Sequence, residues 1–304
     1  MRRIFGAAAV VTAAMLALSA CGGGGNPLTS ASAAPSGSSA AAGGKVVVGS
    51  ANFPENVLLG SIYAQALKAK GVDVEEKPNI GSREVLIGQI KSGGLTVLPE
   101  YNGALLAYLD PKSTAASTDQ VNTELKSKLP PELEILDSSS AQDNDSLTVT
   151  KDTAAKYNLK TIEDLAKVSK DMSVGGPPEF KKRREQQFKD VYGLAFKEWK
   201  PTGDTTADAI KNGTVQAGNV FTTDPKILIN NMVSLEDPKS VFSAQNITPL
   251  VNKAGANDTV TSTLNAISAK LTTDQLVEMM KKLSIDKEDA ATVAKEWLTS
   301  NGLG

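Results

Sequence analysis

The chain has 304 residues, with 32 basic and 34 acidic side chains, a formal net charge of -2 and no histidine. This near balance gives no broad positive field that would attract a phosphate backbone, so we expect no nucleic-acid partner. The lack of histidine excludes a Ser-His-Asp triad, a histidine-ligated zinc ion and acid-base catalysis by imidazole.

The first residues have the pattern of a secretory signal peptide. Arg2 and Arg3 precede an apolar run at residues 4–18, and the sequence LSAC that ends at Cys21 follows. The run is short for a membrane span, so a permanent transmembrane anchor is the weaker interpretation. LSAC resembles the lipobox of bacterial lipoproteins, whose cysteine carries a diacylglycerol. We therefore predict a signal peptide at residues 1–20 and a lipidated Cys21 that anchors an extracytoplasmic protein to the cell membrane.

A linker and a long folded region follow the signal peptide. Residues 22–44 are almost wholly Gly, Ala, Ser and Pro and carry no charge. Such a segment buries too little apolar surface to offset its ordering entropy, so we predict a disordered linker at residues 21–44. Cys21 is the only cysteine, so structural disulfides are excluded. Residues 45–304 are long enough for one large or two ordinary domains.

The folded region opens with a β-α-β pattern. Residues 45–49 form a short apolar run typical of a buried strand, and Pro54 with Glu55 suits the first turn of a helix. Apolar residues then recur at helical spacing until Gly71, where another strand begins. Ligands collect at the carboxyl ends of strands in such sheets, so the loop at residues 50–53 is a candidate site.

The alternation of strands and helices continues along the chain. Thr161 and Asp164 form a helix-capping pair, and the tail at residues 260–303 is mostly helical. Eight regular βα units cannot be counted, so the pattern favours a two-lobed α/β protein over a single barrel.

Four segments, spread over nearly the whole of the predicted folded region, carry a resemblance to a known family. They are similar to the substrate-binding proteins of osmoprotectant ABC importers, the glycine betaine/choline-binding family. The segments are residues 49–56 (GSANFPEN), residues 81–85 (GSREV) with 98–103 (LPEYNG), residues 176–180 (GPPEF) with Arg183, and residues 220–225 (VFTTDP) with 246–251 (NITPLV).

The resemblance implies a fold, a function and partners. It implies a two-lobed α/β fold of the type II periplasmic-binding-protein-like kind, with a hinge of two crossover strands. We place lobe I at residues 45–147 and 249–304, and lobe II at residues 148–248. A protein of this family captures a small solute between its lobes and passes it to the permease subunits of an ABC importer. We expect a monomer with no catalytic activity, no cofactor and no metal.

The resemblance also suggests how a cation would be held. A quaternary ammonium group donates no hydrogen bond, so its capture needs aromatic faces or a carboxylate. Tyr101 aligns with a tyrosine of the family's aromatic box, and Asp145 falls where relatives place a second one. Phe221 adds an aromatic face at a strand end. The structural alternatives are a tyrosine packed in the hinge, an aspartate in a turn, and a phenylalanine in the core.

A ligand carboxylate would need basic groups and hydroxyls. Arg183 aligns with the family's arginine, although its basic neighbours also fit a solvated helix face. Thr222, Thr223 and Asp224 offer polar groups at a strand-to-helix junction, where helix capping is the competing role. Our predicted ligand-binding set also includes five residues of the first two resembling segments: Asn52, Phe53, Ser82, Arg83 and Asn102.

Two departures from the family pattern leave the ligand open. The opening-loop lysine of the betaine binders is Ala51 here, and a family hydroxyl residue is Ala104. Both changes remove side-chain groups that would bind the carboxylate of a ligand, a set of groups that we call the carboxylate clamp. Choline, another cation, or a neutral polar or aromatic solute such as a sugar-like or phenolic compound remains an alternative to glycine betaine. An extracytoplasmic enzyme or an adhesion lipoprotein is a third alternative, and the lack of histidine and of a G-x-S-x-G motif argues against the enzyme.

Overall fold

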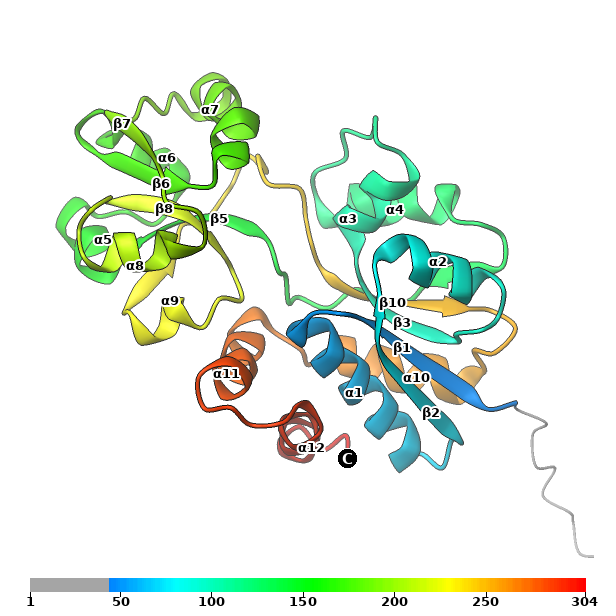
Figure 1. The fold of residues 1–304 in the computed structure, drawn as a ribbon. Helices are drawn as coiled ribbons and strands as arrows, with labels where there is room; N and C mark the ends of the chain where they lie inside the picture. Colours follow the sequence, from blue (N-terminus) through cyan, green and yellow to red (C-terminus); the bar gives the residue numbers. More distant parts are fainter. Residues whose placement is uncertain (1–43) are drawn as a thin grey trace, which may run out of the picture. The chain divides into compact units, whose positions relative to one another are not determined.

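The computed structural model describes residues 44–304, whose strands form two five-stranded sheets (Figure 1). The predicted signal peptide, Cys21 and the linker up to residue 43 lie outside the described residues. We call the elements around the first sheet lobe I and those around the second sheet lobe II. The predicted two-lobed α/β fold is confirmed.

Lobe I comprises β1 (Val46–Ala51), α1 (Pro54–Ala69), β2 (Val74–Gly81), α2 (Arg83–Lys91), β3 (Val97–Tyr101), α3 (Asn102–Leu109), α4 (Thr118–Lys128), β4 (Leu133–Ile135), β10 (Ile247–Asn252), α10 (Asp258–Ser268), α11 (Thr273–Ser284) and α12 (Ala290–Ser300). Lobe II comprises β5 (Asp145–Thr150), α5 (Lys151–Tyr157), α6 (Ile162–Ala166), β6 (Ser173–Gly176), α7 (Pro178–Tyr192), β7 (Glu198–Pro201), α8 (Thr206–Lys211), β8 (Ala217–Phe221), α9 (Lys226–Ile229) and β9 (Met232–Ser234), with 3-10 turns at Ser169–Asp171 and Gly203–Thr205.

The two sheets share one arrangement of strands. Their orders are β2-β1-β3-β10-β4 in lobe I and β7-β6-β8-β5-β9 in lobe II. In each sheet the first three strands are parallel, and the fourth runs antiparallel to the third. Because β1, β2 and β3 are parallel, the residues that follow them meet at one edge of the lobe I sheet.

Two segments cross between the lobes. Residues 136–144 lead from β4 into β5, and residues 235–246 lead from β9 into β10. They run antiparallel through a bridge between Gln142 and Asn246, and the backbone N–H of Asp143 donates to the carbonyl of Gln245 at 3.2 Å. The lobe boundaries drawn from the sequence, at residues 147/148 and 248/249, stay a prediction.

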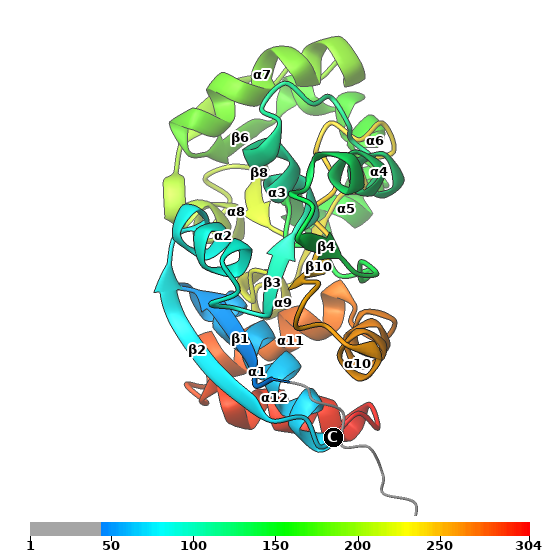
Figure 2. The same cartoon turned by 90° about the vertical axis from the view of Figure 1, so that its right-hand side faces the viewer.

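Alternating side chains of the lobe I strands pack into two hydrophobic cores, one on each face of the sheet. Val97 packs with the buried side chains of α1, α10, α11 and α12, whereas the next residue, Leu98, packs with those of α2, α3 and α4. The helices therefore cover both faces of the sheet, as a mixed sheet with apolar residues on both faces requires (Figure 2).

Local signals end and begin the helices as expected. Gly71 follows α1 with a φ of +79°, a conformation that L side chains rarely adopt. The predicted capping pair of Thr161 and Asp164 forms a reciprocal capping box at the start of α6. Among residues 44–304, none of the helices is both long and apolar enough to cross a membrane.

Candidate ligand-binding site

The residues that follow β1, β2 and β3 line a pocket of about 160 Å³ at the edge of the lobe I sheet. Its wall includes Asn52 and Phe53 after β1, Ser82 and Arg83 at the start of α2, and Tyr101 at the end of β3. The structure therefore brings five of the predicted ligand-binding residues together. Their side chains differ in exposure and in their partners.

An aromatic pair forms the apolar part of this pocket. The ring centroids of Phe53 and Tyr101 lie 6.0 Å apart at an interplanar angle of 32°. Phe53 is 40% exposed, whereas Tyr101 is 7% exposed. The Tyr101 hydroxyl donates to Oε1 of Glu55 at 2.7 Å, so the ring is held in place by its buried end. Such a pair can present an aromatic surface to a cation.

Arg83 has a carboxylate partner of its own in lobe I. Its Nε and Nη2 donate to the two carboxylate oxygens of Glu100, each at 2.9 Å. Glu100 is nearly fully buried and also accepts from the backbone N–H of Tyr101 at 3.0 Å. This two-pronged pair fixes the chain around Tyr101, so Arg83 positions the pocket wall as well as lining it.

Asn102 is not brought to the pocket surface. Its side chain is fully buried, where Nδ2 donates to Oδ1 of Asn122 and Oδ1 accepts from the backbone N–H groups of Gly103 and Asn246. The amide thereby ties the start of α3 to the second crossover segment. These bonds give Asn102 a structural role, and its role as a ligand contact stays a prediction.

Phe221 and Asp145 lie side by side in lobe II. Phe221 ends β8, is 56% exposed and pairs in register with Asp145 of β5. The Asp145 carboxylate accepts from Nδ2 of Asn219 at 3.0 Å and forms ion pairs with Nη2 of Arg183 at 3.6 Å and Nη2 of Arg184 at 3.9 Å. Much of its charge is therefore compensated within lobe II.

Arg183 and Asp145 lie in the same lobe and not on opposite sides of the hinge. Both residues belong to lobe II, where α7 carries Arg183 and the internal strand β5 begins with Asp145. The physical reason is that the loop from β6 to α7 and the start of β5 lie at the same edge of one sheet.

The polar residues after β8 make contacts at the lobe junction. The Thr222 hydroxyl donates to the carbonyl of Gln142 at 2.8 Å and accepts from the backbone N–H of Asn144 at 2.9 Å. The Thr223 hydroxyl donates to Oδ1 of Asp143 at 2.8 Å. Thr222 and Thr223 therefore attach lobe II to the first crossover segment.

Asp224 acts at the start of α9. Its Oδ1 accepts from the backbone N–H of Lys226 at 2.8 Å, a local turn contact, while Pro225 is the N-cap residue of α9 and makes no side-chain capping bond.

Two acidic residues of this region were not predicted from the sequence. Burial, followed by the nearby charge of Asp143, raises the pKa of Glu55 to about 7. Burial likewise raises the pKa of Asp143, to which the charges of Asp145 and Asp224 add. Glu55 looked like an ordinary acidic residue of a first helical turn, and no signal in the sequence links it to a position 88 residues later.

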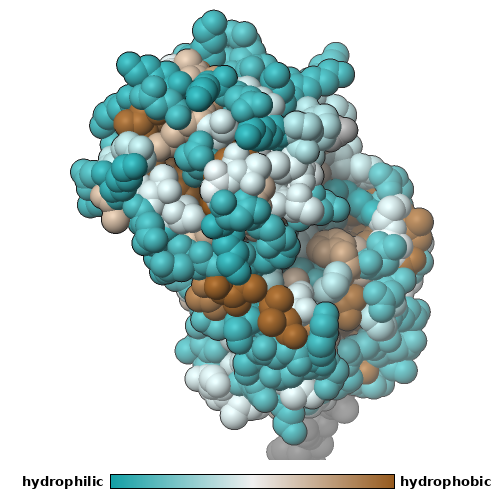
Figure 3. All heavy atoms as spheres, turned by 60° about the vertical axis from the view of Figure 1, so that its left-hand side comes forward, coloured by the Kyte–Doolittle hydropathy of each residue, from teal (hydrophilic) through white to brown (hydrophobic). Residues whose placement is uncertain are grey.

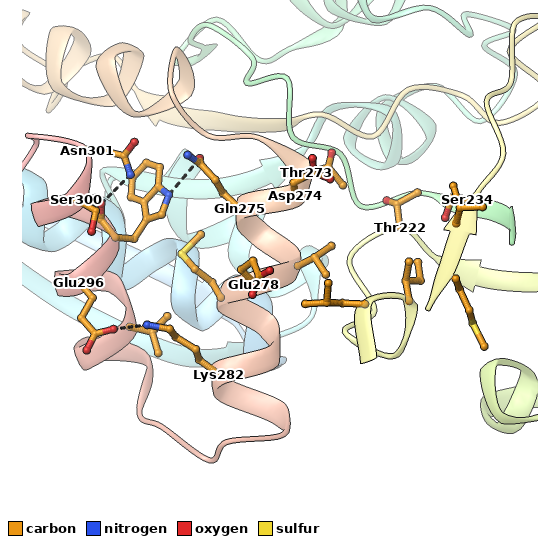
Figure 4. Close-up of a pocket in the computed structure, with 18 of the residues that line it drawn as sticks. Thr222, Ser234, Thr273, Asp274, Gln275, Glu278, Lys282, Glu296, Ser300 and Asn301 are labelled. Atoms are coloured by element: carbon orange, nitrogen blue, oxygen red, sulfur yellow. Dashed lines mark hydrogen bonds and ion pairs between the residues drawn. The ribbon is translucent and has the colours of Figure 1, made fainter. Parts of the chain in front are cut away.

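A larger groove of about 1150 Å³ lies between α9 and β9 on one side and α11 and α12 on the other (Figure 4). On the face shown in Figure 3, apolar side chains gather beside a hollow between the lobes. Two pairs of polar groups in the groove bond to each other: Lys282 pairs with Glu296, and Nε1 of Trp297 donates to Oε1 of Gln275. Of the predicted ligand-binding residues, Thr222 alone is found among those that line it.

The comparisons with known proteins agree with one another. Residues 44–300 match the family described as the substrate-binding domain of ABC-type glycine betaine transport systems. The chain is 27% identical over 277 residues to the glycine betaine-binding protein YehZ of Escherichia coli strain K12, a match that covers 84% of this chain and 90% of the relative.

Solved structures show the same fold. The structure of apo YehZ from Escherichia coli superposes with a TM-score of 0.77 at 25% identity, covering 86% of this chain and 99% of that one. A crystal structure described as a glycine betaine/carnitine/choline ABC transporter gives a TM-score of 0.79 at 20% identity, with coverages of 85% and 99%. Proteins of the matching family are extracytoplasmic substrate-binding proteins, which are not a class of enzyme. The chain belongs to the family of substrate-binding domains of ABC-type glycine betaine transport systems.

Proposed function

We propose that this chain binds a quaternary amine of the choline or glycine betaine type on the Phe53 and Tyr101 rings, between lobe I and lobe II. The observation that carries the proposal is the ring pair at the carboxyl edge of three parallel strands, with the Tyr101 hydroxyl fixed by Glu55. A cation on a desolvated aromatic face gains about 2 kcal/mol or more, which hydrogen-bond donors could not supply to a quaternary ammonium group.

Lobe II contributes the opposite wall in this proposal. Phe221 is a large exposed aromatic side chain two residues before Thr223, which bonds to the crossover segment beside Glu55. A ligand that touches both walls has a higher affinity for the closed arrangement of the lobes and so stabilises it. The closed protein would then deliver its ligand to the permease subunits of an importer.

The missing carboxylate clamp favours a ligand whose binding depends chiefly on its cation. Position 51 lacks a side-chain donor, and the first turn of α3 carries Ala104, whose backbone N–H is already used by Oε1 of Gln245 at 2.9 Å. Arg183 pairs with Asp145 within lobe II. We therefore rank choline above glycine betaine, and a neutral polar or aromatic solute on the same scaffold is the second candidate.

Calorimetric titration of the purified protein with choline, glycine betaine and carnitine tests the proposal. We expect saturable binding of at least one of them, lost in Tyr101→Ala and kept in the matched control Tyr108→Ala. Tyr108 lies on α3 and is 39% exposed, so its loss changes the aromatic content without changing the ring pair. A folded protein that takes up none of the three would contradict a quaternary-amine ligand and direct the search to neutral solutes.

The attachment to the membrane is a separate proposal. We infer that residues 1–20 are removed and that Cys21 carries the lipid, with the linker as a tether and a single copy of the chain as the working unit. Mass spectrometry of the protein from cell membranes should find a diacylglycerol on an N-terminal Cys21. Recovery of Cys21→Ala in the membrane fraction to the same extent as the native chain would contradict this anchor.

A further inference from the structure

Three segments of the chain meet behind the Tyr101 ring. Glu55 comes from the first turn of α1, Asp143 from the first crossover segment, and Thr223 from the loop after β8. The Tyr101 hydroxyl donates to Oε1 of Glu55 at 2.7 Å, and the Thr223 hydroxyl donates to Oδ1 of Asp143 at 2.8 Å. The Thr223 hydroxyl also lies near the Glu55 carboxyl and lowers its pKa, whereas the charge of Asp143 raises it. One threonine hydroxyl thus sits between two carboxyl groups.

The hydrogens available for bonds to Glu55 and Asp143 bear on the protonation of the two carboxyl groups. A threonine hydroxyl has a single hydrogen to donate, and here it goes to Asp143. While Thr223 donates to Asp143, its hydrogen is not available to the Glu55 carboxyl, which is 3% exposed and accepts from the Tyr101 hydroxyl. Burial of a carboxylate with few donors disfavours its charged form, so the geometry favours a proton on Glu55. The arrangement fits two carboxyl groups that hold one proton between them.

The charges around the pair act in the same direction. Glu55 is 3% exposed, and its burial together with the charge of Asp143 raises its pKa to about 7. Asp145 on β5 and Asp224 before α9 face Asp143 and raise its pKa further, after burial itself. Two negative charges on a buried Glu55 and a half-buried Asp143 are costly, so burial and charge together favour a proton here near neutral pH.

The basic side chains near the pair are engaged with other carboxylates. Arg83 on α2 makes its two-pronged pair with Glu100 of β3, while Arg183 and Arg184 on α7 pair with Asp145. These cations therefore compensate charges next to the pair rather than the pair's own. A positively charged ligand on the far side of the Tyr101 ring would supply the compensation that the protein's own arginines give elsewhere.

We propose that Glu55 and Asp143 share one proton and act together as the counter-charge for a cationic ligand bound on the Tyr101 ring. The inference rests on the proposed function. It makes Glu55 a positioning and specificity-determining residue: it holds the tyrosine hydroxyl, and its charge favours permanently charged ligands over neutral ones of the same shape. Because Thr223 links the pair to lobe II, the same proton acts at the junction of the lobes.

The direction of the pH effect follows from charge. A bound cation stabilises the ionised pair, so binding lowers the pair's affinity for its proton and releases part of one near neutral pH. Below the pKa of Glu55 the pair is less negative and the cation binds more weakly. Affinity for a quaternary amine should therefore rise as pH increases through about 7.

The test is calorimetric titration with choline at several pH values between about 5.5 and 8.5. The choline ammonium group has no proton to lose, so any pH dependence at its cation belongs to the protein. We expect the affinity of the native protein to rise roughly tenfold or more over this range. Glu55→Gln keeps an acceptor for Tyr101 and should give a nearly flat profile. The matched control, Glu84→Gln, changes an exposed carboxyl group at the start of α2 and should keep the native profile.

Titrations near pH 7 in buffers of different ionisation enthalpy measure the proton directly. The native protein should release a fraction of a proton per choline bound, and Glu55→Gln should release almost none. If Glu55→Gln fails to fold, Asp143→Asn tests the same pair from its other member. The shared-proton pair would be overturned if the affinity of the native protein for choline did not change with pH, or if both variants kept the native pH dependence. Absence of choline binding at every pH would instead overturn the proposed function.

Discussion

Replacing Arg83 by methionine should destabilise lobe I through the loss of a charge pair, whatever the ligand is. The guanidinium bonds to both oxygens of Glu100 at 2.9 Å, and the Glu100 side chain is only 4% exposed against 28% for Arg83. Without the guanidinium, the buried carboxylate keeps the backbone N–H of Tyr101 as a partner, at 3.0 Å. Water reaches a carboxylate this deep poorly, so the loss is not replaced by hydration.

The magnitude follows from the burial of the two partners. Breaking a buried pair by removing one member costs about 3 kcal/mol or more, since an uncompensated charge remains. Glu100→Gln should cost less, about 1 to 2 kcal/mol, because the partly exposed Arg83 can turn to solvent. The double variant should be more stable than the sum of the two losses predicts, by about 2 kcal/mol. Arg83→Lys should recover little, because a single ammonium cannot make the two-pronged contact.

Urea unfolding of the native protein, Arg83→Met, Glu100→Gln and the double variant gives a double-mutant cycle. Thermal unfolding should show a melting temperature that is lower by roughly 6 to 12 °C for Arg83→Met. Additive losses in the double variant would refute the coupling. A loss below about 1 kcal/mol for Arg83→Met would refute the view that Arg83 positions the wall beside Tyr101.

Three further predictions follow from named contacts. The pKa of Glu55 rises from 4.5 to about 7 on folding, so this group stabilises the fold fully below pH 4.5 and that stability is lost as pH rises to about 7. Relative to Glu55→Gln, the free energy of unfolding of the native protein in urea should therefore fall by about 3 kcal/mol between these pH values. A difference between the two proteins that stays constant with pH would contradict the burial of the Glu55 charge. Phe221→Ala should change the free energy of unfolding by less than about 0.5 kcal/mol, because the side chain is 56% exposed, yet weaken quaternary-amine binding; equal affinity would remove Phe221 from the site. Gly103→Ala would place its Cβ 2.2 Å from the carbonyl oxygen of Ala244 in the second crossover segment, so unfolding experiments should show a loss of about 1 to 3 kcal/mol, and a native-like stability would contradict this close approach.

The sequence predicted the parts of the fold that depend on local signals. The first β-α-β unit was readable because apolar residues of α1 recur at helical spacing and Gly71 ends the helix. Tyr101 was placed at the ligand because its segment resembles the family motif, and the structure then shows it at the end of β3. The region from α4 to β4 was not predicted, since its apolar residues are sparse and its strand has three residues.

The contacts of the site could not be predicted, because they join residues far apart in the chain. Arg83 was expected at the ligand, but its position opposite the buried Glu100 depends on how α2 packs on β3. Asn102 lay next to Tyr101 in a matching motif, yet the turn into α3 directs it into the core. Glu55 and Asp143 come together only through the crossover between the lobes, and no pattern of residues in the sequence indicates this proximity.

The central claim is that the site recognises a positive charge on aromatic faces. The most direct measurement compares choline with its neutral isostere 3,3-dimethylbutan-1-ol, which has the same shape and hydroxyl group but a carbon in place of the charged nitrogen. We predict that choline binds at least roughly tenfold more tightly, since the cation-π contribution of about 2 kcal/mol is absent from the isostere. Equal affinities would contradict recognition of the charge and indicate that the pocket selects its ligand by shape.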